Sequence, residues 1–260
     1  MSATEGAHDR LVFSFFESKR FGLRIFRGTT QGADADSLIR ELERERVDVA
    51  ILRGAAAEAL RAGLSERGLR VIDAGTIVRY AADLRSRVRT SPDPRLGFRR
   101  ATADGTGRLD TMARQVFAGY TTHYHANPLF TPSRILEGYA EWATRYADPN
   151  DPCRSAWIIE YEGQAAGFSC LETAADRSEA RGVLNGILPA WRGRGIYRAM
   201  LRATLDALAA EGIPRFVIAT QTQNLPVQHV WRTERMVFER SESTIHVNAL
   251  LGSATPPAAG

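Results

Sequence analysis

The segment LPAWRGRGIY, Leu188 to Tyr197, joins an apolar run to a stretch with helical spacing. After this segment the larger side chains recur three or four positions apart, as on one face of an amphipathic helix. Gly193 and Gly195 permit positive φ angles and let a ligand approach the backbone closely. Unpaired N–H groups and the dipole at a helix start favour an anion. The segment therefore predicts a strand-to-helix turn that cradles a phosphate or pyrophosphate.

Two well-known phosphate-binding loops do not fit this turn. A P-loop needs a lysine followed by Ser or Thr, and neither is present. A dinucleotide-binding G-x-G-x-x-G motif that starts at Gly193 would end at Arg198, which prevents close packing of helix on strand. A glycine-rich turn with surface arginines and no ligand remains the alternative.

The composition is that of a globular protein. The chain has 260 residues, of which 44% are hydrophobic and 25% charged, enough for one large domain or two smaller ones. No apolar run reaches the roughly 18 residues that a membrane-spanning helix needs. The segment MSATEGAHDR has no basic stretch followed by an apolar one. We expect a cytoplasmic protein without a membrane partner.

Arginine carries nearly all the positive charge. The net charge is +4, and Lys19 is the only lysine. Because the guanidinium fork matches phosphate oxygens, this balance suits an anionic ligand, a nucleotide or a nucleic acid. Cys153 and Cys170 are the only cysteines, which excludes a zinc framework or a disulfide scaffold.

The chain divides at a segment without periodicity, 85–97, which combines charge with two prolines. We expect a small α/β domain over 1–90, a second domain over 96–252 and a disordered tail over 253–260. The pattern of the first domain predicts alternating strands and helices, with strands at 21–28 and 47–54, one or two strands within 69–84, and helices at 33–46 and 55–68.

The second domain has helices before and after a block of strands, which indicates α+β architecture with a mixed sheet. Its predicted helices cover 108–120, 134–147 and 195–211, with a short one from about 226. Its predicted strands cover 96–101, 156–161, 165–173, 180–188 and 215–221, followed by a closing strand pair.

The run from Arg192 to Ile196 resembles the acetyl-CoA-binding motif R/Q-x-x-G-x-G/A of the GNAT N-acyltransferases. The resemblance extends from about Leu96 to Leu250 in the order of elements. It implies a GNAT fold preceded by a smaller, truncated GNAT-like α/β domain. This two-part organisation is similar to that of the TDP-fucosamine N-acetyltransferases.

The resemblance also implies a donor site, with acetyl-CoA or another acyl-CoA as co-substrate and no metal. The strand end at Ile187 and Leu188 would pair with the pantetheine arm, beside a splayed strand at 215–221, and Asn224 would contact the same arm. The pyrophosphate and its surroundings would be held by Arg192, Gly193, Arg194, Gly195, Ile196 and Tyr197.

Two positions depart from the family pattern. Tyr197 stands where the motif has Gly or Ala, and Trp231 stands where many members carry a tyrosine that protonates the leaving thiolate. An indole N–H donates hydrogen bonds but is not an acid at neutral pH. Three alternatives are open: the thiolate leaves unprotonated, another side chain protonates it, or the acyl donor is not the family's usual one. We favour the first, because a thiol pKa near about 8.5 tolerates it. A core role for Trp231 is the alternative.

An amine acceptor must lose a proton before it attacks. Glu172 is the favoured base, against the alternative of a solvated strand-end carboxylate. Asn185, His229, Gln221 and Gln223 are the other polar groups expected near the gap.

The aromatic loop would contact the acceptor through Tyr120, His123, Tyr124 and His125, or would simply be exposed to solvent. His123 and His125 have metal-like spacing, but without an accompanying Cys, Asp or Glu cluster we expect no metal site.

The leading hypothesis is an N-acyltransferase that acts by direct attack of a small-molecule amine, such as a nucleotide-linked amino sugar. One alternative is a GNAT-fold transferase that uses aminoacyl-tRNA, which the high pI permits. The other is a non-catalytic GNAT-like binding protein. A monomer or a homodimer is compatible with each.

Overall fold

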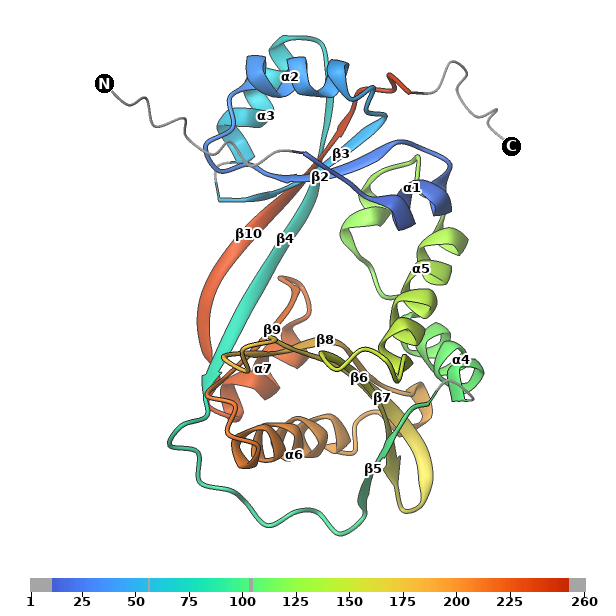
Figure 1. Ribbon diagram of the computed structural model, residues 1–260, viewed down its shortest axis with the longest axis vertical. Helices are drawn as coiled ribbons and strands as arrows, with labels where there is room; N and C mark the ends of the chain where they lie inside the picture. The colour runs from blue at the N-terminus through green and yellow to red at the C-terminus, as the bar shows by residue number, and fades with distance from the viewer. Residues whose placement is uncertain (1–10, 56, 103–104, 253–260) are drawn as a thin grey trace. The chain divides into compact units, whose positions relative to one another are not determined.

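The computed structural model describes residues 11–55, 57–102 and 105–252 (Figure 1). They form two compact units. Unit 1 contains the described parts of 1–77, 122–134 and 241–260, and unit 2 contains 78–121 and 135–240. The units therefore differ from the sequence segments 1–90 and 96–252, because two later segments return to pack with the N-terminal part of the chain. The predicted tail, 253–260, lies outside the described residues.

Unit 1 is an α/β unit with the strand order β1-β2-β3-β10-β4. Strands β2 and β3 are parallel, and β3 and β10 are antiparallel. Its elements are β1 (Val12–Phe13), α1 (Phe15–Phe21), β2 (Ile25–Thr29), α2 (Ala35–Arg44), β3 (Val49–Gly54), α3 (Ala57–Glu66), η2 (His123–Ala126) and parts of the long strands β4 (Arg70–Asp83) and β10 (Val237–Asn248).

Alternation along the strands of unit 1 gives its sheet two different faces. Phe26, Leu52 and Val247 belong to the apolar cluster that packs under α2 and α3, and Figure 1 shows these two helices together. Their neighbours Arg27 and His246 point to the opposite face. There they meet side chains of α1 and of the segment 122–134.

Unit 2 has the strand order β10-β4-β9-β8-β7-β6-β5. Strands β8 and β9 are parallel, and the neighbours from β5 to β8 are antiparallel, so the sheet is mixed as predicted. Its further elements are β5 (Leu96–Arg100), α4 (Thr106–Phe117), α5 (Pro132–Thr144), η3 (Arg145–Ala147), β6 (Arg154–Tyr161), β7 (Gln164–Thr173), β8 (Ala180–Ile187), η4 (Pro189–Trp191), α6 (Ile196–Ala210), β9 (Arg215–Gln221) and α7 (Leu225–Thr233).

Helices cover both faces of the unit 2 sheet. On one face, α4 and α5 pack against alternate residues such as Ile158 and Phe168. On the other, Ile159 and Ile187 pack against the apolar side of α6. A buried cluster around Phe216 and Trp231 joins α6, α7 and β9. This packing fixes the start of α6 against the end of β8.

The predicted closing strand pair is wrong, because β10 is one strand of 12 residues. Its first five residues are exposed and its last five are buried. The sequence therefore changes from polar to apolar within one strand, which is also the pattern expected of two separate strands. The short elements β1 and α1 were not predicted, since their phenylalanines lack a clear period. Among the described residues, no helix is long and apolar enough to cross a membrane.

Candidate functional site

Strands β8 and β9 separate before β8 ends. They pair in parallel at only three positions, from Ala180 with Phe216 to Gly182 with Ile218. A bulge opposite Cys170 and Leu171 adds one residue, Val183, to β8 at the point where this pairing stops. The last five residues of β8 thus have no partner on β9, which matches the predicted splay. Their free backbone edge can bind an extended ligand as a strand would.

The backbone direction at the end of β8 shows which groups face the open side. The N–H of Leu188 donates to the carbonyl oxygen of Ala166 on β7, with 2.8 Å between the atoms. Because alternate residues of a strand turn their N–H groups to opposite sides, those of Ile187 and Asn185 point away from β7. Ile187, predicted to pair with an extended donor, therefore presents its N–H to the open edge, and Leu188 does not.

The turn after β8 has the predicted backbone geometry. Gly193 has φ +77° and Gly195 has φ +75°, the left-handed region that glycine adopts most readily. Helix α6 begins at Ile196, and no side chain caps its first turn. A Cβ built on either glycine would meet nothing within 4 Å, so the surface above the turn is open. The first-turn amides are thus available to an anion.

The two arginines of the turn have different surroundings. Arg192 donates from Nε to the Ile187 oxygen (3.2 Å) and from Nη2 to the Val116 oxygen (3.1 Å). It therefore ties the turn to β8 and α4. The guanidinium of Arg194 lies 4.9 Å from the ring centre of Trp191 and remains exposed. Of the two, Arg194 is the freer to meet a ligand.

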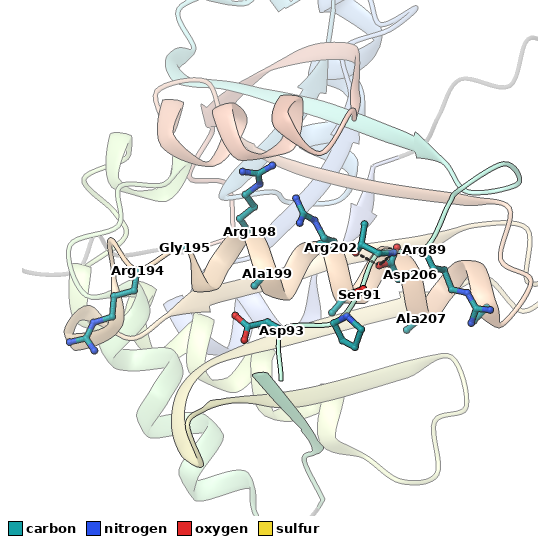
Figure 2. Close-up of a pocket in the computed structure, with 14 residues that line it drawn as sticks. Arg89, Ser91, Asp93, Arg194, Gly195, Arg198, Ala199, Arg202, Asp206 and Ala207 are labelled. Atoms are coloured by element: carbon teal, nitrogen blue, oxygen red, sulfur yellow. Dashed lines mark hydrogen bonds between the residues drawn. The ribbon is translucent and has the colours of Figure 1, made fainter. Parts of the chain in front are cut away.

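A groove of about 680 Å³ runs from the turn along one face of α6 (Figure 2). The segment from Arg89 to Asp93 forms its other wall. The helix contributes Arg194, Gly195, Arg198, Ala199, Arg202, Ala203, Asp206, Ala207 and Ala210. This volume lies within the range typical of small-molecule sites.

A buried carboxylate fixes two arginines of this groove. Glu234 accepts from Arg198 (2.6 Å) and from Arg202 (2.6 and 3.0 Å), and its side chain is 5% exposed. Burial by itself raises the pKa of Glu234, but the hydrogen bonds from Arg202 and Arg198 outweigh it and lower that pKa below 4.5. The carboxylate is thus ionised at neutral pH and holds both guanidinium groups beside α6.

The part of the chain that contains this turn and groove matches a protein-family model. The model of the "Acetyltransferase (GNAT) family" matches residues 120–235, which include the splayed strands, the turn and α6. This part of the chain, 120–235, is thus similar to a GNAT acetyltransferase domain. No curated protein matches the chain.

Solved structures show the same fold at low sequence identity. A functionally unknown conserved protein from Staphylococcus epidermidis ATCC 12228 is 9% identical, with a TM-score of 0.60 over 95% of this chain and 94% of that one. A tandem GNAT protein from the clavulanic acid biosynthesis pathway is 12% identical, with a TM-score of 0.55 over 87% of this chain and 75% of that one. This second likeness supports the two-part architecture.

A glucosamine N-acetyltransferase region in a fungal multi-domain GH3 beta-N-acetylglucosaminidase is 15% identical. Its TM-score is 0.57, over 84% of this chain and 28% of that one.

At the open end of β9, two predicted residues meet. The Tyr120 hydroxyl lies 3.2 Å from Thr220 Oγ1, and Asn224 donates from Nδ2 to the same oxygen at 3.0 Å. Thr220 belongs to the part of β9 that no longer pairs with β8. Tyr120, predicted for the acceptor, and Asn224, predicted for the donor, are thus linked through a residue that the sequence did not single out.

Trp231 lies in the core and is 1% exposed. Its indole N–H donates to the Tyr197 hydroxyl at 3.1 Å, so both side chains are turned toward each other between α6 and α7. The side chain of Tyr197 therefore points toward α7 and does not occupy the space above the turn that precedes α6. The core alternative for Trp231 fits this placement better than the catalytic assignment, because its one donor is already used.

The two predicted polar groups of the strands lie at different levels of the sheet. Asn185 belongs to the unpaired end of β8 and accepts from Ser169 Oγ at 2.6 Å. Glu172 lies opposite Arg181, where β8 still pairs with β9. It accepts from the Tyr146 hydroxyl (3.4 Å) and lies 3.7 Å from Arg154 Nε. This position favours an ion-pair role for Glu172 over the predicted base role.

His123, Tyr124 and His125 belong to unit 1, whereas Tyr120 belongs to unit 2. His123 Nδ1 lies 3.0 Å from His246 Nε2, and His125 Nδ1 caps Thr122. The Tyr124 hydroxyl donates to Glu17 and accepts from Arg27. These three side chains therefore make contacts inside unit 1. In the part of the chain that is described, no group of three His, Cys, Asp or Glu residues could hold a metal ion.

The sequence missed Thr220, Asp206 and Glu234. Each is a polar residue whose partner lies far away in the chain, up to 119 residues for Asp206 and Arg87. Only Glu234 had a signal in the sequence, as a carboxylate that follows a predicted helix among arginines, and this pattern more often marks solvated charge.

Proposed function

We propose that this protein is an N-acyltransferase that moves an acyl group from acyl-CoA to the amine of a small molecule. The main support for this proposal is that β8 continues for five residues beyond its pairing with β9. The strand is followed by a turn with two glycines at the start of α6. The open edge suits the amides of a pantetheine arm. The turn suits the pyrophosphate at the other end of that arm.

The same backbone supplies electrostatic help to the reaction. The outward N–H of Ile187 or Asn185 would donate to the thioester oxygen as negative charge develops there, a pre-organised donor that costs no rearrangement. The deprotonated amine attacks the thioester carbon, the C–S bond breaks, and the sulfur leaves with the electron pair as thiolate. The acyl group passes directly to nitrogen.

Direct attack agrees with the state of the buried cysteine. Cys170 is fully buried and donates from Sγ to the Ala143 oxygen at 3.8 Å. Burial raises the pKa of its thiol far above the usual value, so it is not a nucleophile at neutral pH. Nothing about Cys170 suits it to carry an acyl group between donor and acceptor.

The acceptor that we favour is a small amine, with a nucleotide-linked amino sugar as the first class to test. Many described arginines are engaged in ion pairs, including Arg79, Arg87, Arg202 and Arg215, so the high pI does not translate into a free basic surface. This supports a small molecule over tRNA as the partner, since tRNA binding draws on many unpaired cations.

Thiol release from acetyl-CoA in the presence of a panel of amines tests the proposed reaction. We expect turnover with at least one amine, with the acylated product identified by mass spectrometry. Coenzyme A binding without turnover of any amine would favour a non-catalytic binding protein. Salt-sensitive binding of bulk tRNA without coenzyme A binding would favour a transferase that uses aminoacyl-tRNA.

A further inference from the structure

Tyr120 follows α4 and lies where that helix meets the unpaired end of β8. The backbone N–H of Tyr120 donates to the oxygen of Phe117, the last residue of α4, at 3.0 Å. The residue before, Val116, packs directly on Gly186, since a Cβ built on that glycine would lie 2.1 Å from Val116 Cγ1. Gly186 belongs to the part of β8 that does not pair with β9. The end of α4, and Tyr120 with it, is therefore held beside the unpaired end of β8.

The side chain of Tyr120 reaches from one face of the sheet to the other. Its ring centre lies 5.7 Å from that of Phe117 and 6.4 Å from that of Tyr139, on the face that α4 and α5 cover. Its hydroxyl lies 3.2 Å from Thr220 Oγ1. Thr220 follows Ile218 by two positions and so shares its face, where Ile218 packs with α6 and α7. The phenol thus crosses the level of the sheet beside the unpaired part of β9.

The hydroxyl group of Thr220 joins Tyr120 to Asn224. Asn224 donates from Nδ2 to Thr220 Oγ1 at 3.0 Å. A threonine hydroxyl has one hydrogen and two lone pairs, so an oxygen that accepts from Asn224 still has its hydrogen to donate to Tyr120. In this arrangement the phenol oxygen accepts, and the phenol hydrogen is available to a bound ligand.

A donor bound along the edge of β8 would bring its sulfur to the same place. In the proposed reaction the outward N–H of Ile187 or Asn185 donates to the thioester oxygen, and the sulfur is bonded to the same carbon. The sulfur would therefore lie beside the unpaired end of β8, on the side of β9, where the Tyr120 hydroxyl meets Thr220. A phenol can give a proton to a leaving group, which an indole N–H does not do at neutral pH.

We propose that Tyr120 is the catalytic acid of the acyl transfer and that Thr220 is the positioning residue that orients its hydroxyl. The inference rests on the proposed function. The C–S bond breaks with its electron pair on sulfur, the phenol passes its proton to that sulfur, and coenzyme A leaves as the thiol. The nitrogen loses one proton to water as the amide forms, and water returns one proton to the phenolate. Proton transfer thus comes from the segment after α4 and not from α7, which replaces the expectation that the thiolate leaves unprotonated.

Calorimetry with coenzyme A and with desulfo-coenzyme A, which lacks the thiol, tests the contact without an acceptor. We expect the wild-type protein to bind coenzyme A about threefold more tightly, the scale of one weak hydrogen bond to sulfur. Tyr120→Phe should remove this preference and leave the affinity for desulfo-coenzyme A within about twofold. Tyr139→Phe removes a phenol hydroxyl from the same aromatic group and should leave the preference unchanged.

Turnover of an amine that the protein acetylates tests the proton transfer. Tyr120→Phe should lower kcat at least about tenfold, with the KM for acetyl-CoA within about twofold, because the proton is needed only as the C–S bond breaks. Thr220→Val should lower kcat by a smaller factor, and Thr220→Ser should keep most of the wild-type kcat. A packing role for Thr220 would give the opposite order, since valine matches the shape of threonine and serine does not.

The outcomes separate this inference from the proposed function. If the wild-type protein acetylates an amine but Tyr120→Phe keeps its kcat, or raises only the KM for the amine, the inference is overturned and the proposed function stands. An unchanged preference for coenzyme A over desulfo-coenzyme A in Tyr120→Phe would also overturn it. If the wild-type protein binds neither ligand, the proposed function falls and the inference falls with it.

Discussion

Trp231 donates its indole N–H to the hydroxyl of Tyr197, with 3.1 Å between Nε1 and Oη. This hydrogen bond joins α7 to the first turn of α6, directly after the proposed pyrophosphate turn. Burial raises the pKa of Tyr197 well above its usual value, so the phenol keeps its proton at neutral pH. Trp231 therefore supports the turn from the core, and its one N–H is already used, so in the proposed reaction it would not serve the leaving thiolate.

Removal of either partner should reveal this coupling. Trp231→Phe and Tyr197→Phe should each lose about 1 kcal/mol from the missing hydrogen bond, and Trp231→Phe should lose more because its ring is smaller. The double variant should cost less than the sum, by about 1 kcal/mol in a double-mutant cycle measured by urea unfolding. Strict additivity would show that the two side chains do not interact.

Glycine conformation in the turn should control donor binding. Gly195→Ala forces a Cβ into the left-handed region, at a cost of about 1 kcal/mol, and disturbs the amides at the start of α6. We expect the KM for acetyl-CoA to rise several-fold with a smaller change in kcat. Gly212→Ala is a matched control, because Gly212 has φ +78° and open space at the other end of α6. An equal effect of both substitutions on KM would contradict the assignment of the turn.

The carboxylate of Glu234 should stabilise unit 2 in a pH-dependent way. Glu234→Gln should lower the free energy of unfolding by about 1–3 kcal/mol at pH 7, a range reduced because Arg198 and Arg202 are partly exposed. Since the folded-state pKa is lowered, the stabilisation is present above the unfolded pKa near 4.5 and is lost as the pH falls through the lower folded value.

Urea unfolding at pH 7 and pH 3.5 measures the Glu234 effect. The difference between the wild type and Glu234→Gln should shrink at the lower pH. The exposed Glu211 serves as the control, and Glu211→Gln should stay within about 0.5 kcal/mol of the wild type at both pH values. A difference that persists unchanged at pH 3.5 would count against an ionised Glu234.

The buried histidine pair of unit 1 should make the protein sensitive to mild acid. Burial lowers the pKa of His246 from 6.5 to about 4, with Arg27 and Arg53 adding to the effect and Glu17 opposing it. The pKa of His123 is lowered well below 6.5 for the same main reason. Because the folded pKa is depressed, stability is lost as the pH falls from about 6.5 toward 4.

His246 alone should account for a loss of about 2 kcal/mol between pH 7 and pH 5, from the difference in its pKa between the folded and unfolded states. His246→Gln should remove this part of the pH dependence while an amide still faces His123. Thermal melts at the two pH values give the comparison. An identical loss of Tm in the wild type and the variant would contradict a neutral buried His246.

Local features of the sequence predicted much of unit 2. Strand β9 has the predicted bounds, and α6 lies within one residue of them, because apolar spacing and two glycines identify a strand, a turn and a helix within one short stretch. The prediction that β8 and β9 splay apart rested on the family resemblance. Its physical basis, the extra residue Val183 in β8, has no sequence mark of its own.

Features that depend on distant parts of the chain were not predictable. The return of 122–134 and 241–252 to unit 1 depends on contacts such as His123 with His246, 123 residues apart. Arg87 and Thr90 were predicted to be linker residues, because their partner, Asp206, lies on a helix more than 100 positions later. Polar residues with long-range partners look like ordinary surface charge until the fold brings them together.

Calorimetric titration of the purified protein with coenzyme A tests most directly the central claim, that the turn from Gly193 to Ile196 is a donor cradle. We predict saturable one-to-one binding by the wild type, weakened several-fold by Gly195→Ala and unchanged by Gly212→Ala. Absence of binding at millimolar coenzyme A, in a protein that is shown to be folded, would contradict the claim.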